Sequence, residues 1–479
     1  MDLRLSLDGR VDLAGQIYRQ IRAIILGGRL TRGQMLPPSR DLAKLLGVSR
    51  NTVTAAYDQL TAQGFATGRV GAGTFVSNEL SLRKQSSAAV RTAKLTPRSV
   101  WTDLPVSEHT TAPGAEFDFR AGVPDASLFP YQSWRRLMSE ELRGHRVRSG
   151  VYGEPSGDPR LRAAVAGYLA VSRSITADPR DILITNGTQQ AADLLARVLI
   201  EAGDCVAVED PGYQPPRMLF ESLGAEVVGV PVDSDGIVVD AIPNRAKLVY
   251  VTPSHQYPLG VALSLRRRIA LVDWAARRNA VIMEDDYDTA FADAGKALEP
   301  LHTLDRDGRV IYVGSFSKVM LPTLRLGFLV APPALREPLR SAKFVTDWHT
   351  ALPGQLALAG FIEEGGLARH VRKMARIYRV RRDVIRTVIG EELHPWLEPI
   401  SSAGGMHVSA LMPRATVAQV HDVVACARDR GVAVWPLSDL SLSNPRAGLI
   451  LGCGLIDAQR IHEGLARLRL CLADVLGDG

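Results

Sequence analysis

The stretch "VGSFSKVMLPTLRLGF", residues 313–328, places Lys318 directly after an apolar run that is predicted to be a buried strand. Lysine is rarely found at the end of a buried strand unless its amine is paired, deprotonated or used covalently. Arg325 follows seven residues later, in a second apolar run. Covalent use of the Lys318 amine is therefore one of three roles that the residues leave open.

Three other predicted strand ends carry residues that could form a site with Lys318. Asp285 follows "VIME", Tyr213 follows "VEDPG", and Gly187-Thr188 opens a helix after "ILIT". The free N–H groups at such a helix start attract anions. A lysine, a carboxylate, an aromatic ring, an anion-binding turn and an arginine together suit pyridoxal 5'-phosphate. The lysine would form a Schiff base, the carboxylate would keep the pyridine nitrogen protonated, and the arginine would hold the phosphate.

Each of these signals also has an ordinary structural explanation when it stands alone. The turn could be a normal helix cap, and a loop tyrosine usually serves packing. The carboxylates of "VIMEDDYD" could bind a metal ion, but no His or Cys lies within ligand spacing in the sequence. We therefore predict no metal site.

The elements that would position these residues have an alternating pattern. From about residue 115, short β-rich runs alternate with longer helical runs, which predicts a mostly parallel sheet with helices on both faces. Ligands of such sheets bind at the carboxyl ends of the strands. The length of 479 residues indicates two or three domains. No apolar stretch is long enough to span a bilayer, so we expect a cytoplasmic protein, and the four widely spaced cysteines are expected to be buried thiols.

The N-terminal part of the chain differs in charge and in pattern. The first 114 residues hold 15 Lys/Arg and eight Asp/Glu, a net charge of +7, which suggests a polyanionic partner. Two helical runs separated by Gly47 predict a helix-turn-helix, with Ser39 and Ser49 as candidate caps. "FATGRVGAGTFV" predicts a two-stranded wing. A small helical packing domain is the alternative.

The combination "LPPSRDLAKLLGVSRNTVTAAYDQLTAQGF…GAGTFV" resembles the winged helix-turn-helix of GntR-type transcription regulators. Residues 115–479 resemble fold-type I aminotransferases, and the whole chain resembles the MocR subfamily of GntR regulators. The matching stretches occur in the expected order along nearly the full length: "YGEPSGDPRLRAAVAGYL", "TNGTQQAADLLARVL", "VEDPGY", "VYVTPSHQYPLG", "EDDYD", "VGSFSKVMLPTLRLGFLV" and "RHVRKMARIYRVRRD".

The resemblance implies an α/β chain with a winged helix-turn-helix DNA-binding domain (1–78), a flexible linker (79–114) and an aminotransferase-like domain that binds pyridoxal 5'-phosphate and dimerises (115–479). It implies that Lys318 forms the Schiff base, that Asp285 pairs with the pyridine nitrogen, that Tyr287 bonds the ring hydroxyl and that Tyr213 stacks on the ring. The residues around the phosphate would be Gly187, Thr188, Gln189, Ser315, Ser317 and Arg325. Those that face double-stranded DNA would be Ser49, Arg50, Asn51 and Thr52, with Arg40 and Arg69 near phosphates.

Two departures from the aminotransferase pattern affect the predicted function. The asparagine that usually contacts the ring hydroxyl is missing from "SHQYPLG", where His255 or Gln256 could replace it. The late strand "GLILGCG" lacks the usual carboxylate-binding arginine. Arg446, a few residues earlier, is the nearest candidate to bind an effector carboxylate, although a surface-loop arginine is more common at such a position. We therefore expect a homodimeric transcription regulator controlled by an amino effector, or by the cofactor itself, at the Lys318 Schiff base. An aminotransferase with an appended DNA-binding domain is the alternative, as is a repressor that has lost its cofactor.

Overall fold

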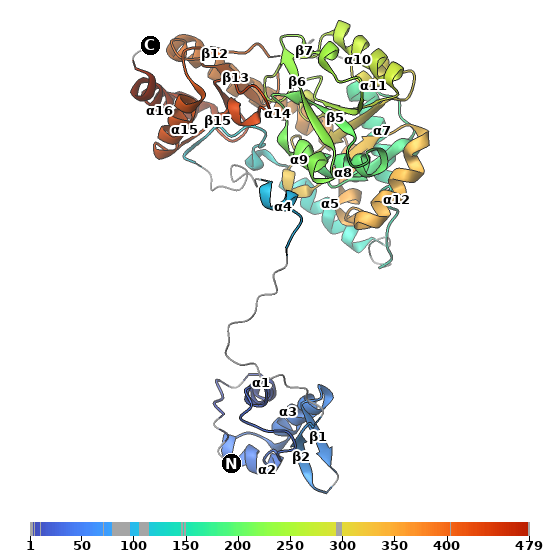
Figure 1. Ribbon diagram of the computed structural model, residues 1–479, viewed down its shortest axis with the longest axis vertical. Helices are drawn as coiled ribbons and strands as arrows, with labels where there is room; N and C mark the ends of the chain where they lie inside the picture. The colour runs from blue at the N-terminus through green and yellow to red at the C-terminus, as the bar shows by residue number, and fades with distance from the viewer. Residues whose placement is uncertain are drawn as a thin grey trace. The chain divides into compact units, whose positions relative to one another are not determined.

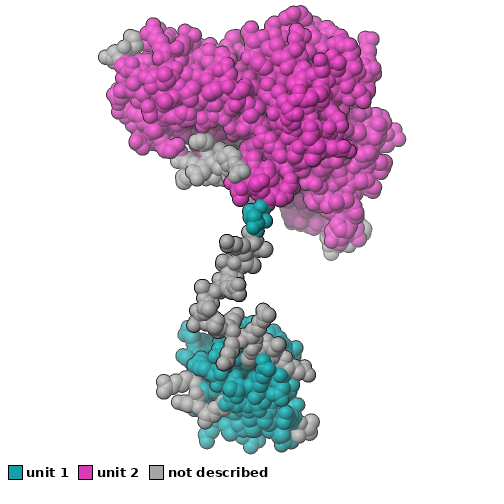
Figure 2. All heavy atoms as spheres, viewed as in Figure 1, with its two compact units in different colours: residues 1–97 teal, residues 98–479 magenta. Residues whose placement is uncertain are grey.

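The computed structural model describes residues 3, 5–9, 11–69, 71–78, 96–104, 115–144, 147, 150–293, 299–402 and 404–477. The chain divides into two compact units, residues 1–97 and residues 98–479 (Figure 2). No helix within the described ranges is long and apolar enough to cross a membrane.

The predicted linker, 79–114, lies largely outside the described residues. The described stretch within it, 96–104, contains a short helix, α4 (Val100–Asp103). Arg98 donates a hydrogen bond to the carbonyl oxygen of Ser222 at 3.4 Å, which attaches this stretch to the larger unit. Residues 100–103 of the predicted flexible linker are therefore helical. Nothing in the sequence indicated this helix, because the range has no sustained apolar period.

The smaller unit contains three helices and a hairpin: α1 (Leu13–Leu26), α2 (Ser39–Leu46), α3 (Arg50–Ala62), β1 (Ala66–Arg69) and β2 (Gly73–Val76) (Figure 1). Gly47 ends α2 with a φ of 66°, a left-handed conformation that favours glycine. Ser49 caps α3 by accepting a hydrogen bond from the Thr52 N–H at 3.1 Å. The prediction for Ser39 is wrong, because Pro38 holds the cap position and Ser39 is the first residue of α2.

Among the described residues, the larger unit contains an eight-stranded sheet in the order β4-β11-β10-β9-β8-β5-β6-β7. Six strands are parallel, and β11 and β7 run against them. The strand bounds are β4 (Ile182–Thr185), β5 (Cys205–Asp210), β6 (Glu226–Asp233), β7 (Gly236–Ile237), β8 (Ala246–Val251), β9 (Val281–Asp286), β10 (Val310–Ser315) and β11 (Gly327–Val330). The prediction of a mostly parallel sheet is confirmed.

Helices cover both faces of this sheet because successive side chains of a strand point to opposite sides. In β5, Val206 and Val208 pack with apolar side chains of α8 (Thr188–Leu199) and α9 (Gln214–Ser222). Cys205 and Ala207 pack on the opposite face with those of α10 (Leu265–Arg278). These buried contacts fix the sheet that carries the candidate site residues.

A second, antiparallel layer lies at the C-terminal end of the larger unit. Its sheet has the order β12-β13-β16-β15, formed by β12 (Glu398–Pro399), β13 (His407–Leu411), β15 (Trp435–Pro436) and β16 (Gly448–Gly452). Its helices are α14 (Gly366–Val388), which leads into the layer, α15 (Val417–Asp429) and α16 (Ala458–Leu476). The short strand β3 (Phe117–Asp118) pairs with β14 (Val432–Ala433), so the start of the larger unit is anchored near its end.

Candidate functional site

Lys318 lies three residues after the end of β10, at the edge where the carboxyl ends of the parallel strands meet. Its Nζ donates a hydrogen bond to the carbonyl oxygen of Gly122 at 2.5 Å. Burial lowers the pKa of Lys318. Gly122 has a φ of 72°, and a Cβ added there would lie 3.1 Å from Nζ, so the approach of the lysine depends on a glycine.

Asp285 lies near the end of the neighbouring strand β9 and is buried. Its Oδ2 accepts a hydrogen bond from the Tyr250 hydroxyl at 2.7 Å. Its Oδ1 is also buried and has no hydrogen-bond partner among the described residues. Burial raises the pKa of Asp285 to about 7, against the opposing effects of the Tyr250 hydrogen bond and the Lys318 charge. A cation at Oδ1 would satisfy the free oxygen and favour the ionised carboxylate.

Partly buried Tyr287 and buried His255 contact each other beside this carboxylate. The Tyr287 hydroxyl lies 2.9 Å from His255 Nδ1. The other nitrogen, Nε2, lies 3.0 Å from the Ser402 hydroxyl oxygen. Gln256, the other candidate for the missing asparagine, donates instead to the carbonyl oxygens of Pro211 and Tyr257. His255 is therefore the candidate that contacts Tyr287.

Tyr213 directly precedes α9 and faces the same region. Its ring meets the Tyr257 ring edge-on, with centroids 5.6 Å apart. The side chain is 37% exposed, which leaves ring surface available for a flat ligand. Burial of the hydroxyl, followed by the charge of Asp285, raises the pKa of Tyr213 to about 12.

The predicted phosphate site lies at the start of α8. Gly187 precedes this helix with a φ of 87°, and a Cβ there would lie 3.4 Å from the Arg325 guanidinium. Arg325 donates a hydrogen bond to the carbonyl oxygen of Asn186 at 2.5 Å. Thr188 is the first residue of α8, so its N–H belongs to the free donors of the helix start. The structure thus brings the turn and the arginine together.

The remaining phosphate candidates are partly engaged by protein groups. The Ser315 hydroxyl accepts a hydrogen bond from the Ser317 N–H at 3.1 Å. The Gln189 Nε2 donates to the carbonyl oxygen of Pro215 at 3.0 Å, whereas its Oε1 is buried without a partner in the described part of the chain. A role of these side chains in anion binding stays a prediction.

Lys343 stabilises the Gly187 turn through the residues that bind Asn186. No motif in the sequence indicated this role. It lies on α12 (Arg336–Asp347), is fully buried, and donates hydrogen bonds to both Asp347 oxygens at 2.6 and 2.7 Å and to Gln190 Oε1 at 2.9 Å. Asp347 Oδ2 accepts from the Asn186 side chain at 2.7 Å, and Gln190 Oε1 accepts from the Asn186 N–H at 2.8 Å. The residue before Gly187 is thereby held through its backbone and its side chain.

We expect Lys343→Met to weaken anion binding at this turn. Removing the buried cation leaves the Gln190 and Asp347 acceptors short of a donor, which costs about 1–3 kcal/mol. Pyridoxal phosphate should then dissociate faster, as followed by spectrophotometry during dialysis, and the urea midpoint should fall. Lys373→Met, at an exposed lysine of α14, is the control. Unchanged cofactor retention in Lys343→Met would show that the buried pair does not support the turn.

Histidines do lie close to the carboxylates that follow β9, although none lies within ligand spacing of them in the sequence. His255 and His407, which are distant from Asp288 in the sequence, offer ligand atoms that lie with the Asp288 carboxylate within 4.8 Å of one another. The donors are engaged, however: His255 Nδ1 lies 3.0 Å from Asp288, and His407 Nε2 lies 2.8 Å from the Pro258 carbonyl oxygen. These contacts indicate a hydrogen-bond network.

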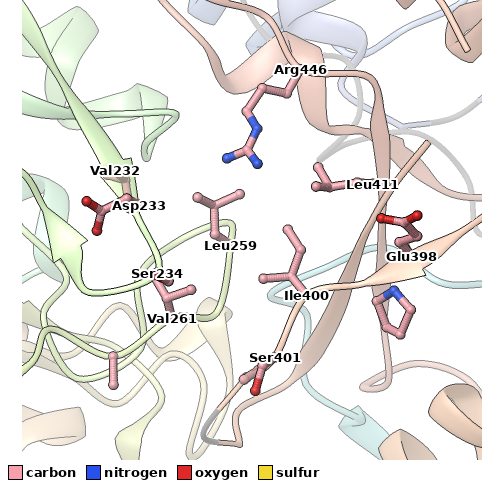
Figure 3. A pocket seen from close by; sticks show the side chains of 13 residues that line it. Val232, Asp233, Ser234, Leu259, Val261, Glu398, Ile400, Ser401, Leu411 and Arg446 are labelled. Carbon is pink, nitrogen blue, oxygen red and sulfur yellow. The ribbon is translucent and has the colours of Figure 1, made fainter. Parts of the chain in front are cut away.

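Arg446 lines a cavity whose lining residues do not include Lys318. It lies in the loop before β16 and shares this cavity with Leu259, Ile400 and Leu411 (Figure 3). A role of Arg446 as an effector ligand stays a prediction.

The predicted DNA-reading residues lie at the start of α3 and around it. Arg50 and Asn51 are exposed at the first two positions of the helix, while Ser49 and Thr52 are engaged in its cap. The other two predicted contacts, Arg40 on α2 and Arg69 at the end of β1, are also exposed. The polar residues 49–52 thus precede the buried stripe of α3, which begins at Val53. Residues at this position of a recognition helix contact base edges.

Comparisons with known proteins assign both units. Residues 13–76 match the gntR family of bacterial regulatory proteins, and residues 118–451 match the aminotransferase class I and II family. The chain is 36% identical, over 98% of its length and 95% of the relative's, to "Probable rhizopine catabolism regulatory protein MocR" of Rhizobium meliloti. It is 33% identical, over 98% of both chains, to the "HTH-type pyridoxine biosynthesis transcriptional regulator PdxR" of Corynebacterium glutamicum.

A solved structure agrees with the fold of the larger unit. The kynurenine aminotransferase of Pyrococcus horikoshii, in complex with PMP, superimposes with a TM-score of 0.73 and 26% identity. The match covers 80% of this chain and 98% of that enzyme.

Proposed function

The chain belongs to the MocR type of gntR-family regulators, and we propose that it controls transcription in response to an amino compound that is sensed through pyridoxal 5'-phosphate. The observation that carries the proposal is the buried Oδ1 of Asp285, which has no partner among the described residues and belongs to a carboxylate that feels the charge of Lys318. The same chain exposes the first two residues of α3, Arg50 and Asn51.

The residues present fit this cofactor. Asp285 Oδ1 would accept the protonated ring nitrogen, and Tyr213 would stack on the ring. Tyr287 would meet the ring hydroxyl, with His255 holding its orientation. The turn before α8 and Arg325 would hold the phosphate through N–H groups and a guanidinium.

Pyridoxal phosphate, when bound, supplies an aldehyde carbon that primary amines attack. Burial lowers the pKa of Lys318, so more of its amine is in the neutral form that acts as a nucleophile. Its hydrogen bond to Gly122 orients the amine. An amino effector would compete with Lys318 for the same carbon and release the side chain.

We propose that the larger unit forms a homodimer through an exposed aromatic cluster. Tyr152 stacks on Trp348 with ring centroids 4.1 Å apart, and Phe344 meets Trp348 edge-on at 4.8 Å. Val151 and Val345 beside them are 72% and 80% exposed. An apolar group of this kind is costly to leave in water, so a second copy of the chain is its proposed partner.

Effector exchange could change DNA binding only if the effector prefers one arrangement of the protein. Two recognition helices in a dimer would suit a two-part operator. A protein that acts on chromosomal DNA in a bacterium would work in the cytoplasm.

The alternative function is an aminotransferase, and turnover distinguishes the two. Strand β16 has no arginine to hold a substrate carboxylate, so we expect amino acids to change the cofactor absorbance with little 2-oxo acid product. Stopped-flow absorbance and product chromatography measure both. Steady turnover in the ordinary enzyme range of roughly 1–10³ per second would instead make the chain an enzyme first.

The proposed regulatory function is tested by binding to the promoter region adjacent to its own gene. The full-length, cofactor-loaded protein should bind this DNA more tightly than a scrambled sequence of equal length. A fluorescence anisotropy titration without any sequence preference would contradict the proposal.

A further inference from the structure

A cavity of about 690 Å³ lies between the parallel-sheet layer and the antiparallel layer, apart from the residues grouped around Lys318 (Figure 3). One wall comes from the end of β6 and the loop after β8. The other wall comes from β12 and the segment that follows it, with the end of β13 and the loop before β16. The aliphatic lining is formed by Leu259, Val261, Ile400 and Leu411.

Two oppositely charged side chains line this cavity, and neither has a partner among the described residues. Arg446 is half-buried, and Figure 3 shows its guanidinium extending from the C-terminal wall toward Leu259. Glu398 lies on the same wall, in β12. Neither side chain makes a hydrogen bond or an ion pair with a described residue, and they do not pair with each other. Asp233, by contrast, is already bound by Arg267 at 2.6 Å.

We propose that this cavity binds a zwitterionic amino acid with an aliphatic side chain. Arg446 binds the carboxylate, since a guanidinium matches its geometry with two parallel hydrogen bonds. Glu398 attracts the ammonium group, and the aliphatic lining covers the side chain. The site goes beyond the function proposed above, because its ligand forms no covalent link and does not involve Lys318.

The floor of the cavity touches the network beside the candidate cofactor site. Ser402 lines the cavity, and its hydroxyl lies 3.0 Å from His255 Nε2. His255 Nδ1 in turn lies 2.9 Å from the Tyr287 hydroxyl. A ligand that moves Ser402 therefore acts on the residue that contacts Tyr287, which gives the cavity a physical connection to the cofactor site.

The experiment uses the full-length, cofactor-loaded protein and N,N-dimethyl-L-leucine, whose tertiary amine cannot condense with an aldehyde. Isothermal titration calorimetry should show binding to the wild type and to Lys318→Ala. Arg446→Gln should weaken it by about tenfold to a hundredfold, the effect of losing a charged hydrogen-bond pair. Arg469→Gln, at an exposed arginine of α16 outside the cavity, should bind as the wild type does.

A second probe tests the ammonium contact. 4-Methylpentanoate lacks the ammonium group, so it should bind more weakly and be insensitive to Glu398→Gln, which should weaken dimethylleucine. The proposal is overturned if Arg446→Gln binds dimethylleucine as the wild type does, if Lys318→Ala abolishes binding, or if the wild type shows no binding at millimolar ligand. None of these results depends on DNA binding or on a covalent link. Failure of this proposal would therefore not contradict the proposed regulatory function, which the promoter-binding experiment tests separately.

Discussion

Lys318→Ala is expected to abolish the covalent attachment of pyridoxal phosphate and the visible absorbance that accompanies it. The partly buried Lys318 donates a hydrogen bond to the Gly122 carbonyl, and its lowered pKa favours the neutral nucleophile. Borohydride reduction followed by peptide mass mapping should place a pyridoxyl group on Lys318 in the wild type. The cofactor can still bind to the variant non-covalently through its phosphate.

Two matched variants sharpen this result. Lys373→Ala removes an exposed lysine of α14 and should leave the labelling intact. Asp285→Asn keeps the shape of the side chain but removes its charge, so it should weaken cofactor retention by about 1.5–3 kcal/mol and shift the absorbance while leaving the covalent link. A pyridoxyl group on another lysine, or on none after incubation with excess cofactor, would refute the assignment.

Arg50→Ala is expected to weaken binding to the operator by about 1–3 kcal/mol and to relax the preference for one base pair. Arg50 is exposed at the first position of α3, where the residues of a recognition helix reach base edges. Fluorescence anisotropy with operator variants measures both effects. Binding of the wild type should also fall steeply as salt rises, because phosphate contacts release counterions.

The control for this prediction is Arg19→Ala, which removes the same charge from α1. Arg19 is exposed, pairs with Asp12 at 3.0 Å and is not among the residues predicted to face DNA. It should change the affinity little and leave the base preference unchanged. Equal losses in the two variants on every DNA sequence would mean that Arg50 contributes only charge, and that specificity lies elsewhere.

The alternation of strands and helices, and the ends of β4, β5, β8, β9 and β10, could be predicted from the sequence. Lys318, Asp285 and Gly187 each follow a short apolar run, and the carboxyl ends of parallel strands meet at one edge. Local signals were equally readable, because Ser49 and Gly47 act on backbone groups within a few residues. These features depend on residues that are close to one another along the chain, so they can be recognised in the sequence.

Contacts between distant segments were decided by tertiary packing alone. His255 and Asp288 follow the neighbouring strands β8 and β9 and lie 3.0 Å apart. Ser402 reaches His255, and His407 reaches the same group, only because the antiparallel layer packs against the strand ends. The absence of a histidine within ligand spacing in the sequence therefore did not predict which side chains surround Asp288 in the folded protein.

Tertiary packing also decided the surroundings of Lys343 and of Arg446. The sequence shows Lys343 four residues before Asp347, a spacing that is common on exposed helices, and only packing against α8 buries it behind the Gly187 turn. Arg446 is close in sequence to the strand where a carboxylate-binding arginine was expected. The loop before β16 instead directs it into a separate cavity, because the direction of a loop side chain is set by the layers it connects and not by its distance along the chain.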